Sequence, residues 1–361
     1  MNPSPTFPGV NHQPAAFRRW LANANVSTIY AVSGAMAGMI SGVAVCPFDV
    51  AKTKLQAQGG LIALNLNSSN PTLAAEARAA AHQPKYHGIV GTLKTIVAED
   101  GPRGLYKGLV PIMLGYLPTW MVYFSAYEST KNHLNRIESL GQYAFVSHML
   151  AAITAGSLST ISTNPIWVVK TRLMSQGPNT PWQYKGTLDA IRTMYRREGI
   201  WVFYSGLGPA LLGLVHVAIQ FPLYERFKKI LECDKPGNND LGKNNMIPNL
   251  IMASSLSKMC ASSITYPHEV IRTRMQIQTV TTKTISTNKN PEKGTAKLKY
   301  RGIYRTFKIL LREEGWRIFY SGFGTNLIRT VPSSAITLVS FELVSEYMKD
   351  IQQKERLERI G

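Results

Sequence analysis

Cysteine is scarce in this chain of 361 residues, and acidic residues are fewer than basic ones. The three cysteines are widely spaced and include no CxxC pair, which excludes a disulfide framework and a cysteine-rich metal site. No Asp or Glu precedes Asp49, and the chain holds 21 acidic against 40 basic residues, a formal net charge of +19. This excess indicates an anionic partner, and a nucleic acid, a membrane surface or a small anion would each satisfy it.

Charged residues are also missing from four long stretches, and this absence points to the fold class. No Asp, Glu, Lys or Arg occurs in residues 21–48, 108–127, 139–169 or 199–224. Each stretch can cross a hydrocarbon core, which takes about 20 helical residues. Two further apolar stretches, 247–271 and 323–345, are interrupted by Lys258 and Arg329, and lipid-facing helices rarely tolerate such charges. The sequence therefore predicts six transmembrane helices.

Three other classes of protein fit these features less well. A soluble all-helical protein would need thick core helices, and four uncharged runs of this length in one such chain are unusual. A nucleic-acid-binding protein would carry its cations in an exposed patch interleaved with aromatics, whereas Lys258 and Arg329 lie inside apolar segments. An enzyme finds no support, because HExxH, GxSxG, GxxxxGK[ST] and a convincing GxGxxG are missing, and His148, His216 and His268 stand alone. No cofactor and no metal site are therefore expected.

A threefold repeat organises the chain. PFDVAKTKLQ from Pro47, PIWVVKTRLM from Pro165 and PHEVIRTRMQ from Pro267 share a proline, an acidic or aromatic residue two positions later, and two cations beyond it. Each string is followed by a second block that starts at YHG, YKG or YRG and ends at a glycine. The first Tyr and the last Gly of this block are 22 positions apart in all three copies. Equal spacing predicts one rigid unit used three times, with a loop of variable length before it.

Each repeat should contain two membrane helices and one short amphipathic helix, such as residues 92–99. The predicted fold class is an all-α membrane protein with six transmembrane helices in three repeats related by a pseudo-threefold axis. We divide the chain into a disordered N-terminal tail, three repeats and a C-terminal tail, with bounds at 1–27, 28–136, 142–232, 247–349 and 350–361.

Proline and charge define one end of the predicted bundle. A proline inside a membrane helix removes a backbone hydrogen bond and kinks the helix, so Pro47, Pro165 and Pro267 should bend three helices toward one axis. The motif charges then become neighbours: Asp49, Lys52, Lys170, Glu269 and Arg272. Charges at membrane depth persist only when they are paired or hydrated, which predicts ion pairs between adjacent repeats at this end.

A second set of charges lies near the far ends of the even-numbered helices. YESTK contributes Glu128 and Lys131, YERFK contributes Glu225 and Lys228, and FELVS contributes Glu342 with Ser345 in place of a cation. A ring of separable ion pairs at each end describes the two gates of a transporter that works by alternating access. The alternative is that each charge only snorkels to its own interface, and the recurrence of both sets across the repeats argues against it.

Together these motifs resemble the mitochondrial carrier family over residues 28–348. The resemblance rests on three strings similar to Px[DE]xx[KR]x[KR], each followed by [DE]Gxxxx[FY]xG. It implies a monomeric six-helix carrier of the inner mitochondrial membrane, with the proline motifs on the matrix side and the YExxK charges on the cytosolic side. The implied matrix pairs are Asp49 with Lys170 and Lys52 with Glu269, and the implied cytosolic pairs are Lys131 with Glu225 and Lys228 with Glu342. The glutamine brace that the family places beneath the matrix pairs is matched by Gln56 and Gln276 but not by Met174.

The chain departs from the family pattern once at each gate. Trp167 replaces the carboxylate that would face Arg272, and Ser345 replaces the cation that would face Glu128. Each gate should therefore lack one ion pair. Because the desolvation of buried charges offsets much of their attraction, the loss weakens a gate by less than the Coulomb energy of the pair.

The resemblance also implies that a substrate binds about halfway along the even-numbered helices. The residues at these positions are Gly115 and Tyr116, Gly213 and Leu214, and Arg329. Arg329 is expected to be an unpaired cation at mid-membrane depth, so a phosphate or carboxylate is its natural partner. Gly213 with an aliphatic neighbour resembles the pair that holds adenine in nucleotide-carrying members. Lys258, which stands where the other repeats have Gly38 and Gly156, adds a second cavity cation unless it only snorkels between helices.

Trp167 is the most informative departure. It resembles the branch of the family that carries pyrimidine nucleotides, flavin, folate and NAD, in which this carboxylate is replaced. Arg272 would then be free to bind phosphate, and the indole free to stack on a base or on that guanidinium; a tryptophan that only packs is the alternative. Strings such as SGVAVCPFDVAKTKLQAQG and HVAIQFPLYE resemble yeast mitochondrial NAD carriers, which implies import of NAD+ by uniport or in exchange for nucleotides such as AMP. A carrier of FAD, folate or pyrimidine nucleotides in the same fold is the alternative.

Cardiolipin is the one lipid partner that the resemblance implies. The family binds it where short helices begin, because glycine exposes backbone amides to a phosphate there. The matching residues are Tyr86 to Gly88, Gly101, Gly186, Gly199, Gly302 and Gly315. A role in helix capping alone is the alternative for these glycines.

Overall fold

Helices make up almost all of the chain that the computed structural model describes. The described residues are 21–66, 85–134, 136, 144–178, 180, 182–231, 240–278, 299–300 and 302–360, and no strand occurs among them. The prediction of an all-α fold is confirmed. Most of the predicted N-terminal tail lies outside the described residues.

In the described part of the chain, six long helical spans alternate with three short helices. The long spans are α2 (Val26–Leu66), α5 (Leu109–Leu134), α7 (Ala144–Ser175), α9 (Leu207–Leu212) followed by α10 (Val215–Ile230), α11 (Asp240–Ile277) and α13 (Phe323–Ile360). The short helices are α4 (Gly88–Asp100), α8 (Thr187–Glu198) and α12 (Ile303–Glu313), each followed by one turn of 3₁₀ helix, η2 (Pro102–Tyr106), η3 (Ile200–Tyr204) and η4 (Trp316–Tyr320). The motif prolines Pro47, Pro165 and Pro267 lie inside α2, α7 and α11.

Four stretches of the described residues are long and apolar enough to cross a membrane by length and composition. They are Val26–Ile62, Pro102–Leu134, Ile200–Ile230 and Trp316–Glu355. Helix α7 is of similar length but contains more serine and threonine. Several hydroxyl groups of α7 line an internal cavity, which accounts for this polarity.

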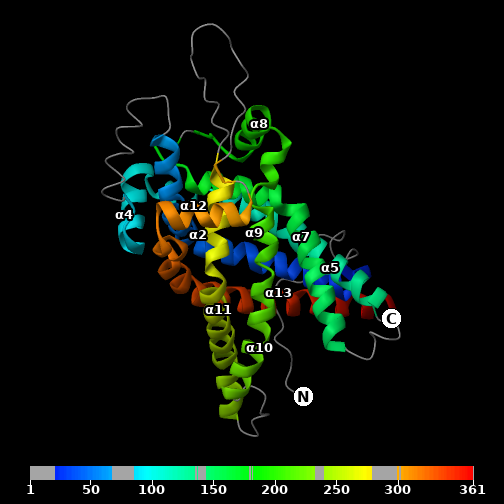
Figure 1. Ribbon diagram of the computed structural model, residues 1–361. Coiled ribbons are helices and arrows are strands. Elements are labelled where there is room, and N and C mark those ends of the chain that lie inside the picture. The colour runs from blue at the N-terminus through cyan, green and yellow to red at the C-terminus, as the bar shows by residue number, and fades with distance from the viewer. Residues whose placement is uncertain are drawn as a thin grey trace, which may run out of the picture.

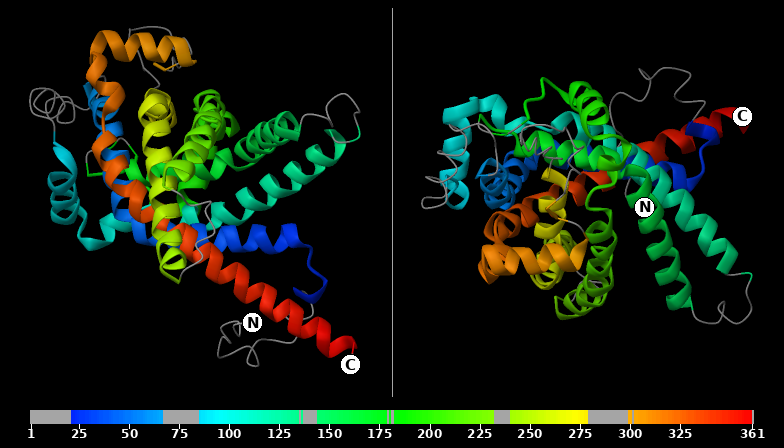
Figure 2. Two further views of the ribbon diagram at one scale, coloured as in Figure 1. Left: turned by 90° about the horizontal axis from the view of Figure 1, so that it is seen from below. Right: turned by 45° about the horizontal axis from the view of Figure 1, so that its top comes forward.

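The long spans meet at one end of the molecule and diverge at the other (Figure 1). Helices α4, α8 and α12 surround the end where they meet, which we call the motif end because the proline motifs lie there. Away from it the spans run as three pairs, α5 with α7, α10 with α11, and α13 with α2, which point in different directions (Figure 2). Each pair joins two repeats, and the α13–α2 pair closes the ring between the last helix and the first.

A glycine directly precedes the second, fourth and sixth long spans, which begin with α5, α9 and α13. Each of these glycines packs against the backbone of another repeat. Gly108, Gly206 and Gly322 all have positive φ, between 74° and 85°. A Cβ atom at these positions would lie 3.1–3.3 Å from the carbonyl oxygen of a motif cation, respectively Lys170, Arg272 and Lys52. Glycine is therefore needed twice over, for the backbone conformation and for the close approach. Since Gly322 contacts Lys52, this packing also joins the third repeat to the first.

Replacement of Gly322 by alanine is expected to destabilise the folded protein by about 1–3 kcal/mol, because the side chain would strain a left-handed residue and press on the carbonyl of Lys52. Gly324 is the matched control, since it lies two residues further on and has open space around the position of a Cβ atom. Gly324→Ala should be neutral or slightly stabilising. Thermal unfolding in detergent measures both variants, and equal midpoints would contradict the proposed contact.

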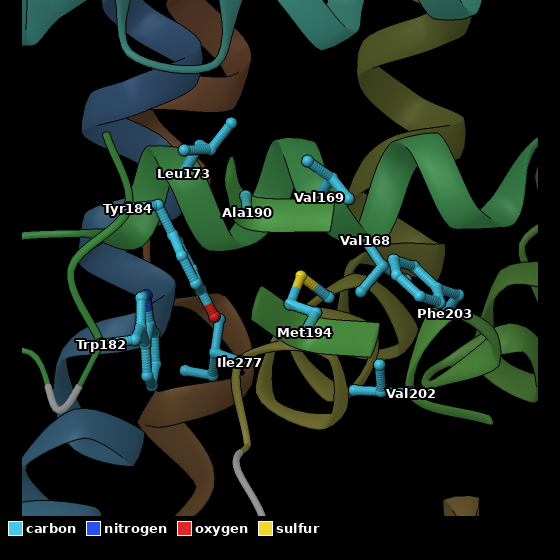
Figure 3. Close-up of a cluster of buried hydrophobic side chains, with 11 residues drawn as sticks. Val168, Val169, Leu173, Trp182, Tyr184, Ala190, Met194, Val202, Phe203 and Ile277 are labelled. Carbon is cyan, nitrogen blue, oxygen red and sulfur yellow. The ribbon is translucent and has the colours of Figure 1, made fainter. Parts of the chain in front are cut away.

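The largest buried cluster lies at the motif end and connects the repeats (Figure 3). Val168, Val169 and Leu173 of α7 contribute to it, together with residues of α8 and η3. Ala57 of α2 and Ile277 of α11 complete it, so all three repeats share one core here. Burial of apolar surface at this end holds the spans together where they meet.

The helix α13 is longer than the sequence indicates. Residues 350–360, assigned to a C-terminal tail, continue α13, where Ile351 is fully buried with Leu21 and Ile29. Gln352 donates hydrogen bonds to the carbonyl oxygens of Leu21 and Ala24, both at 2.9 Å. The polar end of the chain is therefore ordered by its contacts with the segment that precedes α2.

Candidate substrate cavity and gate

A polar cavity of about 350 Å³ lies at the centre of the motif end. Five spans line it: α2, α5, α7, α11 and α13. Its walls combine the motif charges with hydroxyl groups of α7 and two aromatic rings, Tyr116 and Trp167. A second hollow, of about 470 Å³, is lined by the free end of α5 and the residue Arg136 beyond it, so it joins no two spans. The central cavity is the candidate site.

Both ion pairs that the resemblance implies for the motif end are present. Lys170 Nζ lies 3.1 Å from Asp49 Oδ2, and Lys52 Nζ pairs with Glu269 Oε1. The first pair links α2 to α7 and the second links α2 to α11. All four side chains line the cavity.

The two motif glutamines also connect repeats. Gln56 donates to the Tyr266 hydroxyl at 2.9 Å and accepts from the Thr273 hydroxyl at 2.8 Å, which joins α2 to α11. Gln276 accepts from the Thr171 hydroxyl at 2.7 Å, which joins α11 to α7. In the remaining repeat Met174 offers only its sulfur, 3.7 Å from the Thr53 hydroxyl. The sulfur of Met174 is a weaker hydrogen-bond acceptor than the amide oxygens of the two glutamines. This agrees with the departure of Met174 from the glutamine of the family pattern.

The third interface of the gate, between α7 and α11, has no ion pair among the described residues. Trp167 occupies the carboxylate position and donates from Nε1 to the Thr163 hydroxyl at 3.1 Å. Its ring meets Tyr116 edge-on, with centroids 6.0 Å apart. The cation against the indole is Lys170 of the same helix, 5.2 Å from the ring centroid, and not Arg272. Arg272 lines the cavity, and none of the described carboxylates forms an ion pair with it.

Arg329 is paired, and the prediction of an unpaired cation is wrong. Its Nη1 donates to Asp49 Oδ1, and its Nη2 lies 3.4 Å from Asn326 Oδ1. Asp49 therefore binds two cations, Lys170 from α7 and Arg329 from α13. Sequence spacing along one helix cannot reveal this contact, because the carboxylate comes from another repeat. Arg329 Nε is buried without a hydrogen-bond partner in the described structure, so the guanidinium retains a free donor.

The other predicted substrate residues fall into two groups. Tyr116 lines the cavity, and Gly115 lies behind it against Ile166 and Trp167, where a Cβ atom would be 3.2 Å from Ile166. Gly213, Leu214 and Lys258 lie outside the cavity lining. Their contacts are as follows: Gly213 faces the imidazole of His268, Leu214 packs on Gly156, and Lys258 Nζ is 3.5 Å from the Ser334 hydroxyl.

Gly213 therefore does not open a slot into this cavity. A Cβ atom on Gly213 would lie 2.7 Å from His268 Nε2, so the glycine makes room for a side chain of α11. At Gly213 and Leu214 the helix tightens to i→i+3 hydrogen bonds, seen from Leu214 N to Leu211 O and from Val217 N to Leu214 O. This short 3₁₀ stretch separates α9 from α10.

The two ion pairs predicted for the opposite end are absent from the described residues. Lys131 forms no ion pair with Glu225, and Lys228 forms none with Glu342, although all four residues are described. Lys228 instead lies 3.9 Å from Glu225 of its own helix. The divergence of the three helix pairs explains this separation, since the partners stand on different pairs (Figure 2). Glu128 and Ser345 are likewise on separate pairs.

The second cation of each motif has a partner that sequence reasoning missed. It binds the carboxylate just before the glycine that follows the short helix, within the same repeat: Lys54 with Asp100 (3.5 Å), Arg172 with Glu198 (2.8 Å) and Arg274 with Glu314 (2.8 Å). The three cations are almost completely buried. The signal was available, because an acid precedes Gly101, Gly199 and Gly315 in the second block. These pairs attach α4 to α2, α8 to α7 and α12 to α11.

A glutamine four residues after each of these cations was also missed. Gln58, Gln176 and Gln278 accept hydrogen bonds from the backbone N–H groups of Tyr86 (2.6 Å), Tyr184 (3.0 Å) and Tyr300 (3.0 Å). The glutamines thus hold the start of the second block in every repeat. Burial raises the pKa of the Tyr86 and Tyr184 hydroxyls, which keeps both protonated beside the motif cations.

Several known proteins are similar in sequence to most of this chain. The family described as Mitochondrial carrier protein matches residues 25–138, 141–235 and 243–352. A mitochondrial nicotinamide adenine dinucleotide transporter 1 of Saccharomyces cerevisiae is 49% identical over 92% of this chain and 80% of its own length. The mitochondrial nicotinamide adenine dinucleotide transporter 2 of Arabidopsis thaliana is 38% identical, over 88% and 79%. Solute carrier family 25 member 36 of Mus musculus is 31% identical, over 88% and 96%. The chain therefore belongs to the mitochondrial carrier family, and it is a multi-pass transporter of the inner mitochondrial membrane rather than an enzyme.

Proposed function

We propose that this carrier imports NAD+ into the mitochondrial matrix, by uniport or in exchange for nucleotides such as AMP. Two relatives of the chain are named as nicotinamide adenine dinucleotide transporters, at 49% and 38% identity. The substrate has two phosphates and two flat rings, and the cavity offers both guanidinium and aromatic groups. Such chemistry suits a dinucleotide better than a simple carboxylate.

The observation that carries the proposal is that Arg272 lines the same cavity as Trp167 and has no carboxylate partner among the described residues. The other two motif positions hold ion pairs, so a guanidinium without a carboxylate at this depth favours an anionic ligand. Arg329 supplies a second guanidinium from α13. Together the two side chains can bind the pyrophosphate, while Trp167 and Tyr116 offer faces and edges to a ring.

The closed motif end and the separated far end support alternating access. The motif charges are paired at one end while the second set of charges stays apart at the other. With the motif end on the matrix side, as we propose, this state admits substrate from the cytosol. Transport then requires that the motif pairs separate and that Lys131 with Glu225 and Lys228 with Glu342 come together.

Cardiolipin and a monomeric state belong to the same proposal. The predicted glycines around the short helices have open space about the Cβ position at Gly88, Gly101, Gly186, Gly199, Gly302 and Gly315. No side chain caps the amides of α4, α8 and α12. Backbone N–H groups at these helix starts suit the phosphates of cardiolipin, and three such places fit a single chain with three repeats.

Uptake by liposomes containing the purified carrier tests the substrate. Liposomes loaded with AMP should take up labelled NAD+, and unlabelled NAD+ outside should compete for this uptake more effectively than UTP, FAD or folate. The same assay with empty liposomes separates uniport from exchange. Brisk exchange of UTP without NAD+ flux would replace this proposal with a carrier of pyrimidine nucleotides.

A further inference from the structure

We propose that Asn326 is a positioning residue that couples the substrate site at Arg329 to the gate pair Lys52–Glu269. The inference rests on the proposed transport function and assigns a residue to one step of it. Asn326 lies on α13, one helical turn before Arg329, and is 4% exposed. Sequence motifs give no reason to single it out.

The amide of Asn326 is engaged on both sides. Its Oδ1 accepts a hydrogen bond from Lys52 Nζ at 2.7 Å and lies 3.4 Å from Arg329 Nη2. Its Nδ2 donates to the Ser262 hydroxyl of α11 at 2.7 Å. The bond to Ser262 fixes which way the amide points, so that the oxygen faces the two cations. One buried side chain therefore touches a gate cation and a substrate cation at the same time.

Through Asn326 and Arg329, α13 braces both ion pairs of the gate. Arg329 binds Asp49, whose other partner is Lys170. Asn326 binds Lys52, whose other partner is Glu269. The gate lacks its third pair among the described residues, since a tryptophan stands opposite Arg272. A brace from one turn of α13 thus supports the two pairs that remain.

Binding of an anionic substrate should release this brace. A phosphate that binds Arg329 competes with Asp49 for the guanidinium, and movement of Arg329 also removes it from Asn326. A ligand shifts a conformational equilibrium only through contacts that differ between the states, and exchange of Asp49 for phosphate is such a contact. Asn326 transmits the change to Lys52. We therefore expect Asn326 to make opening of the gate depend on bound substrate. Without its side chain the gate should open more often when no substrate is bound.

The test compares two initial rates of uptake by liposomes containing the carrier: the rate into empty liposomes, which is uniport, and the rate into nucleotide-loaded liposomes, which is exchange. The quantity reported is the ratio of uniport to exchange. Asn326→Ala should raise this ratio about tenfold, the factor for loss of one hydrogen bond to a charged group. Asn326→Asp should lower it, because a carboxylate binds Lys52 and Arg329 more strongly than an amide oxygen does. An unchanged ratio in Asn326→Ala would overturn the proposal, and so would a shift of both variants in the same direction.

Two further variants separate coupling from damage to the fold. Thr330→Val is the matched control, because Thr330 is also buried on α13 and its described hydrogen bond goes to the Asn326 carbonyl of its own helix, at 2.7 Å. It should leave the ratio unchanged. Ser262→Ala frees the amide of Asn326 and should raise the ratio as Asn326→Ala does, to a smaller extent, which provides a test if Asn326→Ala does not fold. Every measurement uses the nucleotide that the wild-type protein exchanges, so absence of NAD+ flux would contradict the substrate and not the coupling.

Discussion

Replacement of Arg329 by alanine is expected to reduce NAD+ uptake about a hundredfold or more, because two hydrogen bonds from a guanidinium to a phosphate are lost. The protein should still fold. Asp49 keeps Lys170 as a partner at 3.1 Å when Arg329 is removed, so no buried carboxylate is left without a cation. The measurements are the initial rate of labelled NAD+ uptake into AMP-loaded liposomes and the unfolding midpoint in detergent.

Two comparisons make the result at Arg329 specific. Arg329→Lys retains the charge but not the planar fork that reaches both Asp49 and Asn326, so it should recover only a small part of the rate. Lys354→Ala removes another cation of α13, one that is 42% exposed and pairs with Asp350 of its own helix, and it should transport normally. Normal uptake by Arg329→Ala would exclude Arg329 from the substrate site.

Replacement of Trp167 by glutamate is expected to slow exchange about tenfold, the factor for about 1.4 kcal/mol of added stability in the closed state. Glutamate at this position would face Arg272 and complete the third interface, as Asp49 and Glu269 complete the other two. The same change should raise the unfolding midpoint. Maximal exchange rate and thermal unfolding of the purified variant measure the two effects.

The control for this substitution must remove the indole without adding charge. Trp167→Gln does so, and it should lose affinity for the nucleotide without the added stability. The double variant Trp167→Glu with Arg272→Gln should return the exchange rate toward that of Trp167→Gln, which isolates the new ion pair. If Trp167→Glu and Trp167→Gln turn over equally fast, the carboxylate has no effect on the gate.

The fold could be predicted because its main signals are local. Uncharged runs mark the long spans, and the fixed spacing of the second block marks the short helices. The end of α13 could not be predicted this way. Largely polar residues up to Ile360 continue this helix, and its far end is held by the tertiary contacts of Ile351 with Leu21 and Ile29.

The candidate site could be predicted only where it follows the repeat. The pairs of Asp49 with Lys170 and of Lys52 with Glu269 lie at equivalent positions, so periodicity brings them together. The contacts of α13 break that symmetry. Nothing in its sequence says that Arg329 reaches Asp49, since this depends on how deeply the side chain extends toward the first repeat.

The role of a glycine in packing could not be predicted from the sequence either. The resemblance places Gly213 at the substrate site, whereas in the structure it accommodates His268 of the neighbouring span. A missing side chain in a sequence indicates space or close approach but does not tell which. Only the position of the neighbouring helix decides between them, and that information is tertiary.

The measurement that tests the central claim most directly is the appearance of NAD+ inside sealed liposomes. An NAD-dependent dehydrogenase and its alcohol are enclosed with AMP, and NAD+ is added outside, so that NADH fluorescence reports only NAD+ that has crossed the bilayer. The fluorescence should rise with the wild-type carrier and stay at the protein-free level with Arg329→Ala. A wild-type signal no higher than that of protein-free liposomes, in preparations that exchange another nucleotide, would contradict the account.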